Sequence, residues 1–329
     1  MSERFESLQN WLKESLNTSD FVLKPASEDA SFRYYYRLAL ENKTFIVMDA
    51  PPDQEDCRPF VKVSDILRSS NVNVPIIHNI DLQQGFLLLS DFGDEHYLNK
   101  LSDSTANDLY SDAIRTIVLM QAGSDTTELS KYDEALLRRE MCLFTDWLLD
   151  KHLGITLNTD QAKAIDAVFD LLVTNAIQQP QVFVHRDFHS RNLMLTTENN
   201  PGVIDFQDAV HGPITYDLMS LLKDCYIKWS KDEVNAWIDF YLDELAIMHS
   251  ELEIDRAQFQ RWFDFMGVQR HLKASGIFAR LSYRDGKHGF LKDIPRTLSY
   301  IVDLKHSYEE LLPLCQLIEE SILPELEER

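Results

Sequence analysis

Three polar side chains between positions 187 and 205 have the types and the spacing that phosphate chemistry needs. Asp187 is followed five residues later by Asn192 and thirteen residues after that by Asp205, which ends a short apolar run. Carboxylate and carboxamide oxygens are hard ligands of the kind that Mg²⁺ binds. Phosphoryl transfer requires a base for the attacking hydroxyl group and two ligands for the metal that neutralises the phosphates. The three residues therefore indicate a phosphoryl-transfer site.

Short elements around these residues must bring them together. The apolar runs between positions 182 and 206 predict small strands. If a loop joins two of these strands, Asp187 and Asn192 lie at its two ends and Asp205 lies on the neighbouring strand. Taken singly, Asp and Asn near strand ends are more often turn residues or caps. The combined spacing favours a shared metal–phosphate cluster instead.

The rest of the chain predicts two lobes. Residues 1–92 combine an opening amphipathic helix and a helix from Pro59 with strand-like runs at 31–40, 44–50, 74–80 and 85–90. Beyond them the periodicity is mainly helical, over residues 103–120, 131–153, 160–176 and from 215 onward. We therefore expect an α+β chain with a small, β-rich nucleotide-binding lobe, residues 1–92, and a larger catalytic and substrate-binding lobe, residues 93–329.

The order of the polar motifs resembles a known group of folds. His185–Asn192 reads H-x-D-x-x-x-x-N, and the I-D-F of the run Ile204–Asp208 follows it. This is the catalytic-loop and metal-strand pattern of protein-kinase-like enzymes. With a second histidine at position 189, and with Gln207 where the kinase motif has glycine, the chain resembles the aminoglycoside phosphotransferase and choline-kinase branch. The resemblance implies a bilobal protein-kinase-like fold.

A narrower resemblance extends over nearly the whole chain. Six segments are similar to the bacterial N-acetylmuramate/N-acetylglucosamine anomeric kinases of cell-wall sugar recycling: Met48–Phe60, Gly85–Asp94, Arg138–Leu149, Ile204–Cys225, Gln269–Lys287 and Asp293–Tyr300. That resemblance implies transfer of the γ-phosphate of ATP, with Mg²⁺, to the anomeric hydroxyl of an amino sugar. The catalytic motif alone supports only a small-molecule kinase.

The resemblance also implies roles for single residues. Asp187 matches the catalytic base, and Asn192 and Asp205 match the magnesium ligands. Asp217 is expected to cap the catalytic loop from the following helix. Two more residues are expected near the phosphates or the sugar, namely the cation Arg191 and the carboxylate Asp208.

Two parts of a protein kinase are missing from the first lobe. The segment Lys24–Ser31 is expected to be a loop, but it has no glycine to cover the phosphates. The strand predicted over 44–50 has Met48 or Asp49 where the kinase motif has lysine. We expect the backbone amides of Ala30 and Ser31, together with Arg33 or Arg37, to replace them. Asp91-Phe92-Gly93 precedes the catalytic loop, so we assign it to the hinge, where Leu89 and Asp91 would lie beside the adenine.

The sugar site is expected on the helices of the second lobe. Glu140 and Asp146 are candidates for hydrogen bonds to sugar hydroxyls. The lactyl carboxylate of N-acetylmuramate requires a cation, and the candidates in the segment Gln269–Lys287 are Arg270, His271 and Arg280. This segment and its flanks, residues 268–296, hold seven Lys or Arg against two Asp.

Composition limits the partners. The chain has 329 residues, 44% of them hydrophobic, and a net charge of −22, which disfavours nucleic acid and anionic membranes. The four cysteines lie far apart, which excludes a zinc ribbon and favours reduced thiols, and no apolar run is long enough to span a bilayer. We expect a cytoplasmic protein that binds ATP and a small amino sugar. Protein partners are not predicted.

Two rival hypotheses remain at this stage. A nucleotide-binding pseudokinase would explain the missing lysine and glycines, although such proteins usually lose the base or a metal ligand, and Asp187, Asn192 and Asp205 are all present. A kinase for another alcohol, such as choline, homoserine or an aminoglycoside, would share the same catalytic motif.

Overall fold

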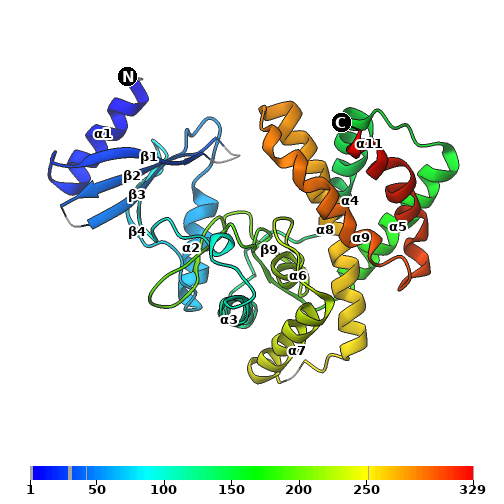
Figure 1. Cartoon of the computed structure of the whole chain (residues 1–329). Coiled ribbons are helices and arrows are strands. Elements are labelled where there is room, and N and C mark those ends of the chain that lie inside the picture. Colours follow the sequence, from blue (N-terminus) through cyan, green and yellow to red (C-terminus); the bar gives the residue numbers. More distant parts are fainter. Residues whose placement is uncertain (1–2, 29–31, 42, 251, 329) are drawn as a thin grey trace. The chain divides into compact units, whose positions relative to one another are not determined.

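A computed structural model describes residues 3–28, 32–41, 43–250 and 252–328 of the chain (Figure 1). The chain forms two compact units. The first unit contains Met1–Glu95 together with Met194–Asp208, and the second contains His96–Leu193 together with Ala209–Arg329. The catalytic loop therefore belongs to the second unit, whereas Asp205 belongs to the first.

The first unit is built on an antiparallel five-stranded sheet in the order β1-β2-β3-β5-β4. Helix α1 (Glu3–Leu16) lies beside this sheet in Figure 1, and its buried Leu8, Trp11 and Leu12 pack against Leu38 and Phe86. The opening helix is confirmed, and the strand-like runs at 31–40 and 44–50 contain two strands that pair antiparallel. The strands are β1 (Val22–Glu28), β2 (Tyr34–Leu40), β3 (Lys43–Asp49), β4 (Ile77–Asp81) and β5 (Phe86–Ser90).

The predicted loop over Lys24–Ser31 is wrong in its first half, because Val22–Glu28 forms the edge strand β1. The apolar pattern does not predict this strand, because the strand is polar and contains Pro25. A sheet tolerates proline mainly at an edge or a bulge. The register indeed shifts between Pro25 and Ser27. Ala30 and Ser31 lie outside the described residues.

Helix α2 (Arg58–Ser69) and the segment 194–208 complete the first unit. Val203, from strand β8 (Gly202–Val203), donates its N–H to the Asn73 carbonyl at 2.7 Å. The ring of Phe206 lies 4.7 Å from that of Phe60 on α2, centroid to centroid. These contacts attach the residues around Asp205 to α2.

The second unit is mainly helical, as predicted. The predicted helix over 131–153 changes to π-helical hydrogen bonding at Phe144. The strands β6 (Gln181–Val184) and β9 (Val210–Pro213) pair with each other, and β7 (Leu193–Met194) leads into the first unit. The helices are α3 (Ala106–Gly123), α4 (Glu134–Leu143), η2 (Phe144–Leu153), α5 (Thr159–Ile177), α6 (Tyr216–Leu222), α7 (Lys231–Met248), α8 (Arg256–Asp285), α9 (Ile294–Val302), α10 (Leu312–Leu317) and α11 (Leu323–Glu327), with shorter turns η1 (Tyr97–Asn99), η3 (His288–Asp293), η4 (Glu309–Leu311) and η5 (Ile318–Ile322).

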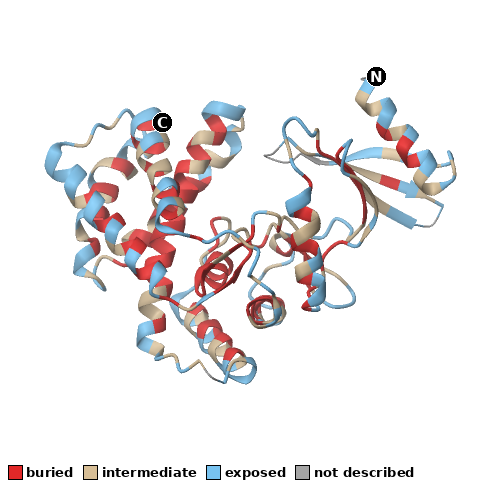
Figure 2. Cartoon of the chain, turned by 180° about the vertical axis from the view of Figure 1, so that it is seen from behind, coloured by how far each residue is buried: buried red, intermediate tan, exposed pale blue. Residues whose placement is uncertain are grey.

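Helix α8 is the central element of the second unit, and its middle is buried (Figure 2). At Gly276 it meets the junction of α4 and η2 backbone to backbone, since a Cβ placed there would lie 2.3 Å from the Leu143 carbonyl carbon. This close approach fixes the side chains of α8 against those of α4. Among the described residues no helix is long and apolar enough to cross a membrane.

Candidate active site

The loop after β6 is held at its start by Asp217 of α6. The Asp217 carboxylate accepts the backbone N–H of His185 at 2.7 Å and that of Arg186 at 3.0 Å. This anchors Arg186 in a left-handed conformation, φ 78°, which side-chain-bearing residues rarely adopt. The predicted cap is confirmed. Burial raises the pKa of Asp217 to about 7, although both backbone hydrogen bonds lower it.

Hydrogen bonds inside the loop hold its two predicted functional residues. Asn192 Nδ2 donates to the Asp187 carbonyl at 3.0 Å, and the Asn192 N–H donates to the His189 carbonyl at 2.9 Å. His185 is completely buried, and its Nδ1 accepts the Asp187 N–H at 3.2 Å. The structure thus brings Asp187 and Asn192 together across the loop, while His185 supports the loop from the core.

Asp224 is a further anchor that the sequence did not reveal. Its Oδ2 accepts both the N–H and the hydroxyl of Ser190, at 3.0 Å and 2.5 Å. Its own backbone carbonyl accepts the Tyr300 hydroxyl at 3.2 Å. Asp224 follows α6 by two residues, and no local motif marks it. The middle of the catalytic loop is therefore fixed by a buried carboxylate.

A buried charge cluster lies behind the loop, made of Tyr132, Glu140, Arg186 and Lys273. Glu140, predicted to bind sugar, is only 5% exposed and forms ion pairs with Arg186 and with Lys273, the latter at 3.2 Å from Nζ to Oε1. Tyr132 donates its hydroxyl to the same carboxylate. Burial raises the pKa of Glu140, but Lys273 and Arg186 outweigh it and hold the pKa below its ordinary value.

The same cations act on Asp187. Burial raises the pKa of its carboxyl, whereas the positive charge of Lys273, followed by His189 and Arg186, lowers it, and the net pKa lies below the ordinary range. The carboxylate is therefore ionised at neutral pH and is able to accept a proton from a hydroxyl group.

Two arginines of α8, Arg270 and Arg280, make few hydrogen bonds to other described residues. Arg270 is 6% exposed, and its guanidinium donates to Cys225 Sγ at 3.7 Å. Arg280 is half-buried, and its Nε has no hydrogen-bond partner among the described residues. With Lys273 they follow each other at helical spacing on α8, so they share one face. This face, called the α8 cation face below, suits an anionic group.

The other predicted substrate residues of the second unit have different surroundings. The Arg191 guanidinium carbon lies 3.6 Å from the Tyr226 ring centroid, which is cation–π contact. His271 is buried and donates its Nε2–H to the Lys223 carbonyl at 2.9 Å, and burial lowers its pKa to about 3. Asp146 is exposed on η2. The structure therefore places Arg191 against aromatic rings, His271 in the core and Asp146 in solvent.

In the first unit, Asp205 has a left-handed backbone, φ 65°, and accepts a hydrogen bond from Gln207 Nε2 at 2.9 Å. Such a conformation in a residue other than glycine is typical of functional sites. Asp208 is exposed in the following turn. Arg33 pairs with Glu55 at 3.1 Å from Nη2 to Oε2.

The hinge candidates also belong to the first unit. Asp91 accepts hydrogen bonds from Arg37 Nε at 2.7 Å and from the Gly93 N–H at 2.8 Å. Leu89, on β5, is 3% exposed. The Asp91 side chain thus shapes the turn after β5.

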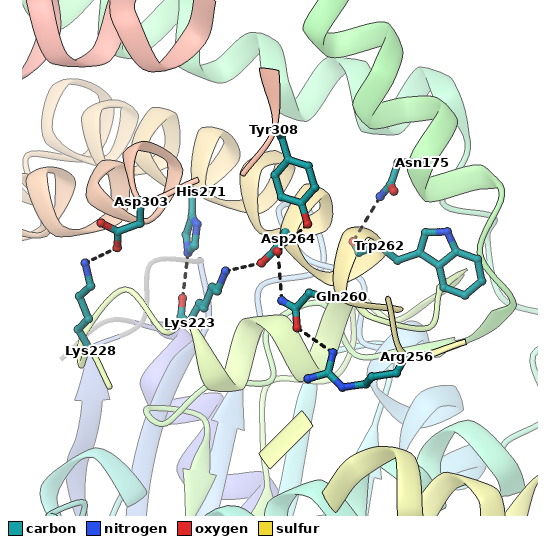
Figure 3. A network of polar contacts seen from close by, with 10 residues as sticks. All are labelled: Asn175, Lys223, Lys228, Arg256, Gln260, Trp262, Asp264, His271, Asp303 and Tyr308. Carbon is teal, nitrogen blue, oxygen red and sulfur yellow. Dashed lines mark hydrogen bonds and ion pairs between the residues drawn. The ribbon is translucent and has the colours of Figure 1, made fainter. Parts of the chain in front are cut away.

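A cavity of about 740 Å³ lies elsewhere in the second unit. Figure 3 shows the polar network along it, in which Asp264 pairs with Lys223 at 2.8 Å and accepts the Tyr308 hydroxyl at 2.9 Å. Lys228 pairs with Asp303 at 2.7 Å. None of the predicted site residues lines this cavity, so the predicted chemistry lies outside it.

The chain matches a model of the phosphotransferase enzyme family over residues 22–254. The chain belongs to this family. The prediction of a phosphotransferase is therefore confirmed.

Relatives of known name extend the likeness over nearly the full chain. The N-acetylmuramate/N-acetylglucosamine kinase of Pseudomonas aeruginosa is 44% identical over 325 residues, covering 96% of this chain and 96% of the relative. The enzyme of the same name from Neisseria meningitidis serogroup B is 39% identical over 325 residues, covering 97% and 96%. The suspected family resemblance is confirmed.

Solved structures share the fold. The choline kinase LicA from Streptococcus pneumoniae matches with a TM-score of 0.65 at 10% identity, covering 93% of this chain and 100% of that chain. The ADP-bound aminoglycoside phosphotransferase APH(2'')-Ib matches with a TM-score of 0.59 at 14% identity, covering 89% and 97%. The predicted protein-kinase-like fold is confirmed.

Proposed function

We propose that this phosphotransferase transfers the γ-phosphate of ATP to the anomeric hydroxyl of N-acetylmuramate, N-acetylglucosamine or both, in the recycling of cell-wall sugars. The names of the relatives at 39–44% identity support the substrate class. The observation that carries the chemistry is Asp187, an ionised carboxylate held in a fixed loop beside Asn192.

Asp187 orients the anomeric hydroxyl and accepts its proton as the oxygen attacks. Its backbone is fixed from both sides, because Asp217 holds the loop before it and Asp224 holds Ser190 after it. Lys273 keeps the carboxyl ionised until the hydroxyl binds. These residues place the base without requiring movement during the reaction.

Asn192 of the second unit and Asp205 of the first are the proposed ligands of Mg²⁺, since both carry the hard oxygen donors that the ion prefers. Among the described residues there is no group of three or more His, Cys, Asp or Glu that would hold a metal by itself. Oxygen atoms of ATP would complete the coordination. The ion supplies neutralisation of the phosphate charge. Leu89 and the Asp91 backbone are proposed to lie beside the adenine.

The α8 cation face is the proposed site for the lactyl carboxylate of N-acetylmuramate. Arg270 donates to Cys225 Sγ, and Arg280 Nε has no hydrogen-bond partner among the described residues, so a substrate carboxylate would be able to accept hydrogen bonds from these guanidinium groups. Glu140, Asp146, Arg191 and Asp208 remain proposed contacts to sugar or phosphate. For Glu140 this contact would add to its ion pairs with Arg186 and Lys273.

A substrate panel tests the proposal. The purified chain is incubated with ATP, Mg²⁺ and, separately, the two amino sugars, an aminoglycoside, choline and homoserine, and mass spectrometry detects any phosphorylated product. We expect product from an amino sugar only. Product from choline, homoserine or the aminoglycoside alone would assign the chain to another alcohol, and product from none would favour a pseudokinase.

Single substitutions then test the carboxylate site. Arg270→Ala or Arg280→Ala should raise KM for N-acetylmuramate about tenfold or more, while KM for N-acetylglucosamine, which has no carboxylate, changes little. Equal losses for the two sugars would contradict the assignment of the α8 cation face.

A further inference from the structure

The first unit lacks the lysine on β3 that protein kinases use to bind the ATP phosphates. Both residues at that place have other roles. Met48 is fully buried in the core, and Asp49, 4% exposed, accepts a hydrogen bond from Arg4 Nε of α1 at 2.8 Å. An acid paired with the opening helix offers no positive charge to a phosphate, so the cation must come from another residue.

Most arginines of the first unit are unsuitable. Arg37 is shared between the carboxylates of Asp91 and Asp94 in the turn after β5. Arg58 pairs with Asp56 in solvent, and its side chain is 78% exposed. Arg33 differs from both, because its side chain is only 9% exposed and it pairs with Glu55, which lies between β3 and α2.

The position of Arg33 corresponds to that of the missing lysine in one respect. Tyr34, the next residue, pairs with Asp49 across β2 and β3, so Arg33 lies one residue beyond the end of that ladder, at the end where β3 leads towards α2. Glu55 lies in the segment between β3 and α2. The Arg33–Glu55 pair therefore connects the sheet with the approach to the helix, as the lysine–glutamate pair connects strand and helix in protein kinases.

The charge of Asp205, the predicted magnesium ligand, acts on Arg33. Burial lowers its pKa, but Tyr35, Glu55 and Asp205 together raise it above the ordinary value. The contact of Phe206 with Phe60 attaches the neighbourhood of Asp205 to α2. A guanidinium is planar and binds carboxylate and phosphate oxygens through a fork of N–H groups, so one arginine is able to contact Glu55 and a phosphate at the same time.

We propose that Arg33, oriented by Glu55, is the phosphate-binding cation of this chain and replaces the strand lysine of protein kinases. The inference rests on the proposed use of ATP. It makes Glu55 a positioning residue, which acts through Arg33 and has no contact with the nucleotide.

Calorimetric titration of the full chain, with Mg²⁺ and without sugar, tests the assignment apart from turnover. Arg33→Met should lower the affinity for ATP and for ADP about 10- to 100-fold, because their phosphates lose a charge-assisted contact. The affinity for adenosine, which has no phosphate, should change by no more than about twofold. Arg33→Lys should recover part of the loss. Glu55→Gln should lower the ATP affinity about threefold. Arg58→Met, the exposed control, should bind ATP with the affinity of the unaltered chain.

Thermal melting identifies any variant that fails to fold, and Arg33→Lys and Glu55→Gln then carry the test. The proposal would be overturned if both Arg33 variants bound ATP with unchanged affinity, or if the affinities for ATP and adenosine fell equally. An unaltered chain that binds no ATP would overturn it together with the proposed function. A chain that binds ATP but phosphorylates no sugar would refute the proposed function alone, because the affinities would still decide the role of Arg33.

Discussion

The charged residues behind the catalytic loop and those of the first unit are organised differently. In the second unit Glu140, Arg186 and Lys273 form a buried cluster, and buried Asp217 and Asp224 accept backbone N–H groups of the loop. In the first unit Arg37 of β2 pairs with Asp91 and Asp94 in the turn after β5, and Arg33 pairs with Glu55 between β3 and α2. The catalytic loop is thus fixed by several buried contacts, whereas the first unit has separate ion pairs at its strands and turns.

This difference explains which family features the chain keeps. A loop supported by several buried carboxylates loses its geometry when any one of them changes, so its motif is close to the general kinase pattern. A single exposed or half-buried pair tolerates replacement, and β3 carries Met48 and Asp49 where protein kinases have lysine.

Removing the central acid of the buried charge cluster should have the largest effect on stability. Glu140→Gln leaves Arg186 and Lys273 buried without a counter-charge, and breaking such a pair costs about 3–5 kcal/mol. Urea unfolding measures the loss. A cost below about 1 kcal/mol would show that the cluster is solvated and would remove the contrast between the two units.

The cap of the loop should have a smaller effect. Asp217→Asn keeps one acceptor and leaves one of the two backbone N–H groups of His185 and Arg186 unpaired, which costs about 1–3 kcal/mol. Turnover should fall as well, because the loop before Asp187 loosens. Asp217→Ala removes both acceptors and should cost more than Asn; equal costs would argue against hydrogen bonding as the cause.

The stability of the chain should also depend on pH through Asp217. Burial raises its folded pKa to about 7 from the ordinary value of 3.8. Between these values the folded chain holds a proton that the unfolded chain has lost, so the contribution of this group to stability falls as pH rises through the window. The free energy of unfolding of the unaltered chain, relative to that of Asp217→Asn, should therefore decrease from about pH 4 to pH 7. A constant difference would contradict the raised pKa.

An exposed pair of the first unit should have almost no effect. Arg58→Ala removes an ion pair with Asp56 in which both side chains are largely exposed, and such pairs contribute about 0–1 kcal/mol. Urea unfolding should show a change within about 0.5 kcal/mol. A loss comparable to that of Glu140→Gln would mean that surface pairs determine the stability of this chain.

The part of the site that the sequence predicts is the part that lies within local motifs. Asp187, Asn192 and the cap by Asp217 lie within one stretch of the chain, so their spacing is visible without the fold. Glu140 was also recognisable in part, because it lies between Leu137, Met141 and Phe144 on the buried face of its helix. An acid at such a position requires buried cations, and the sequence does not show which.

The remaining partners depend on packing between distant segments. Lys273 reaches Glu140 across 133 positions only because Gly276 lets α8 approach α4. Asp224 anchors Ser190 without any motif of its own. Strand β1 was missed because an edge strand tolerates polar residues and Pro25, so its alternation is weak.

The central claim is that an ionised Asp187 in a fixed loop is the base of an amino-sugar kinase. The most direct measurement compares the unaltered chain with Asp187→Asn for phosphorylation of N-acetylglucosamine by ATP and Mg²⁺, with ATP affinity determined in parallel. The account predicts that turnover falls at least about 100-fold while ATP binds with nearly unchanged affinity. Turnover equal to that of the unaltered chain would contradict it.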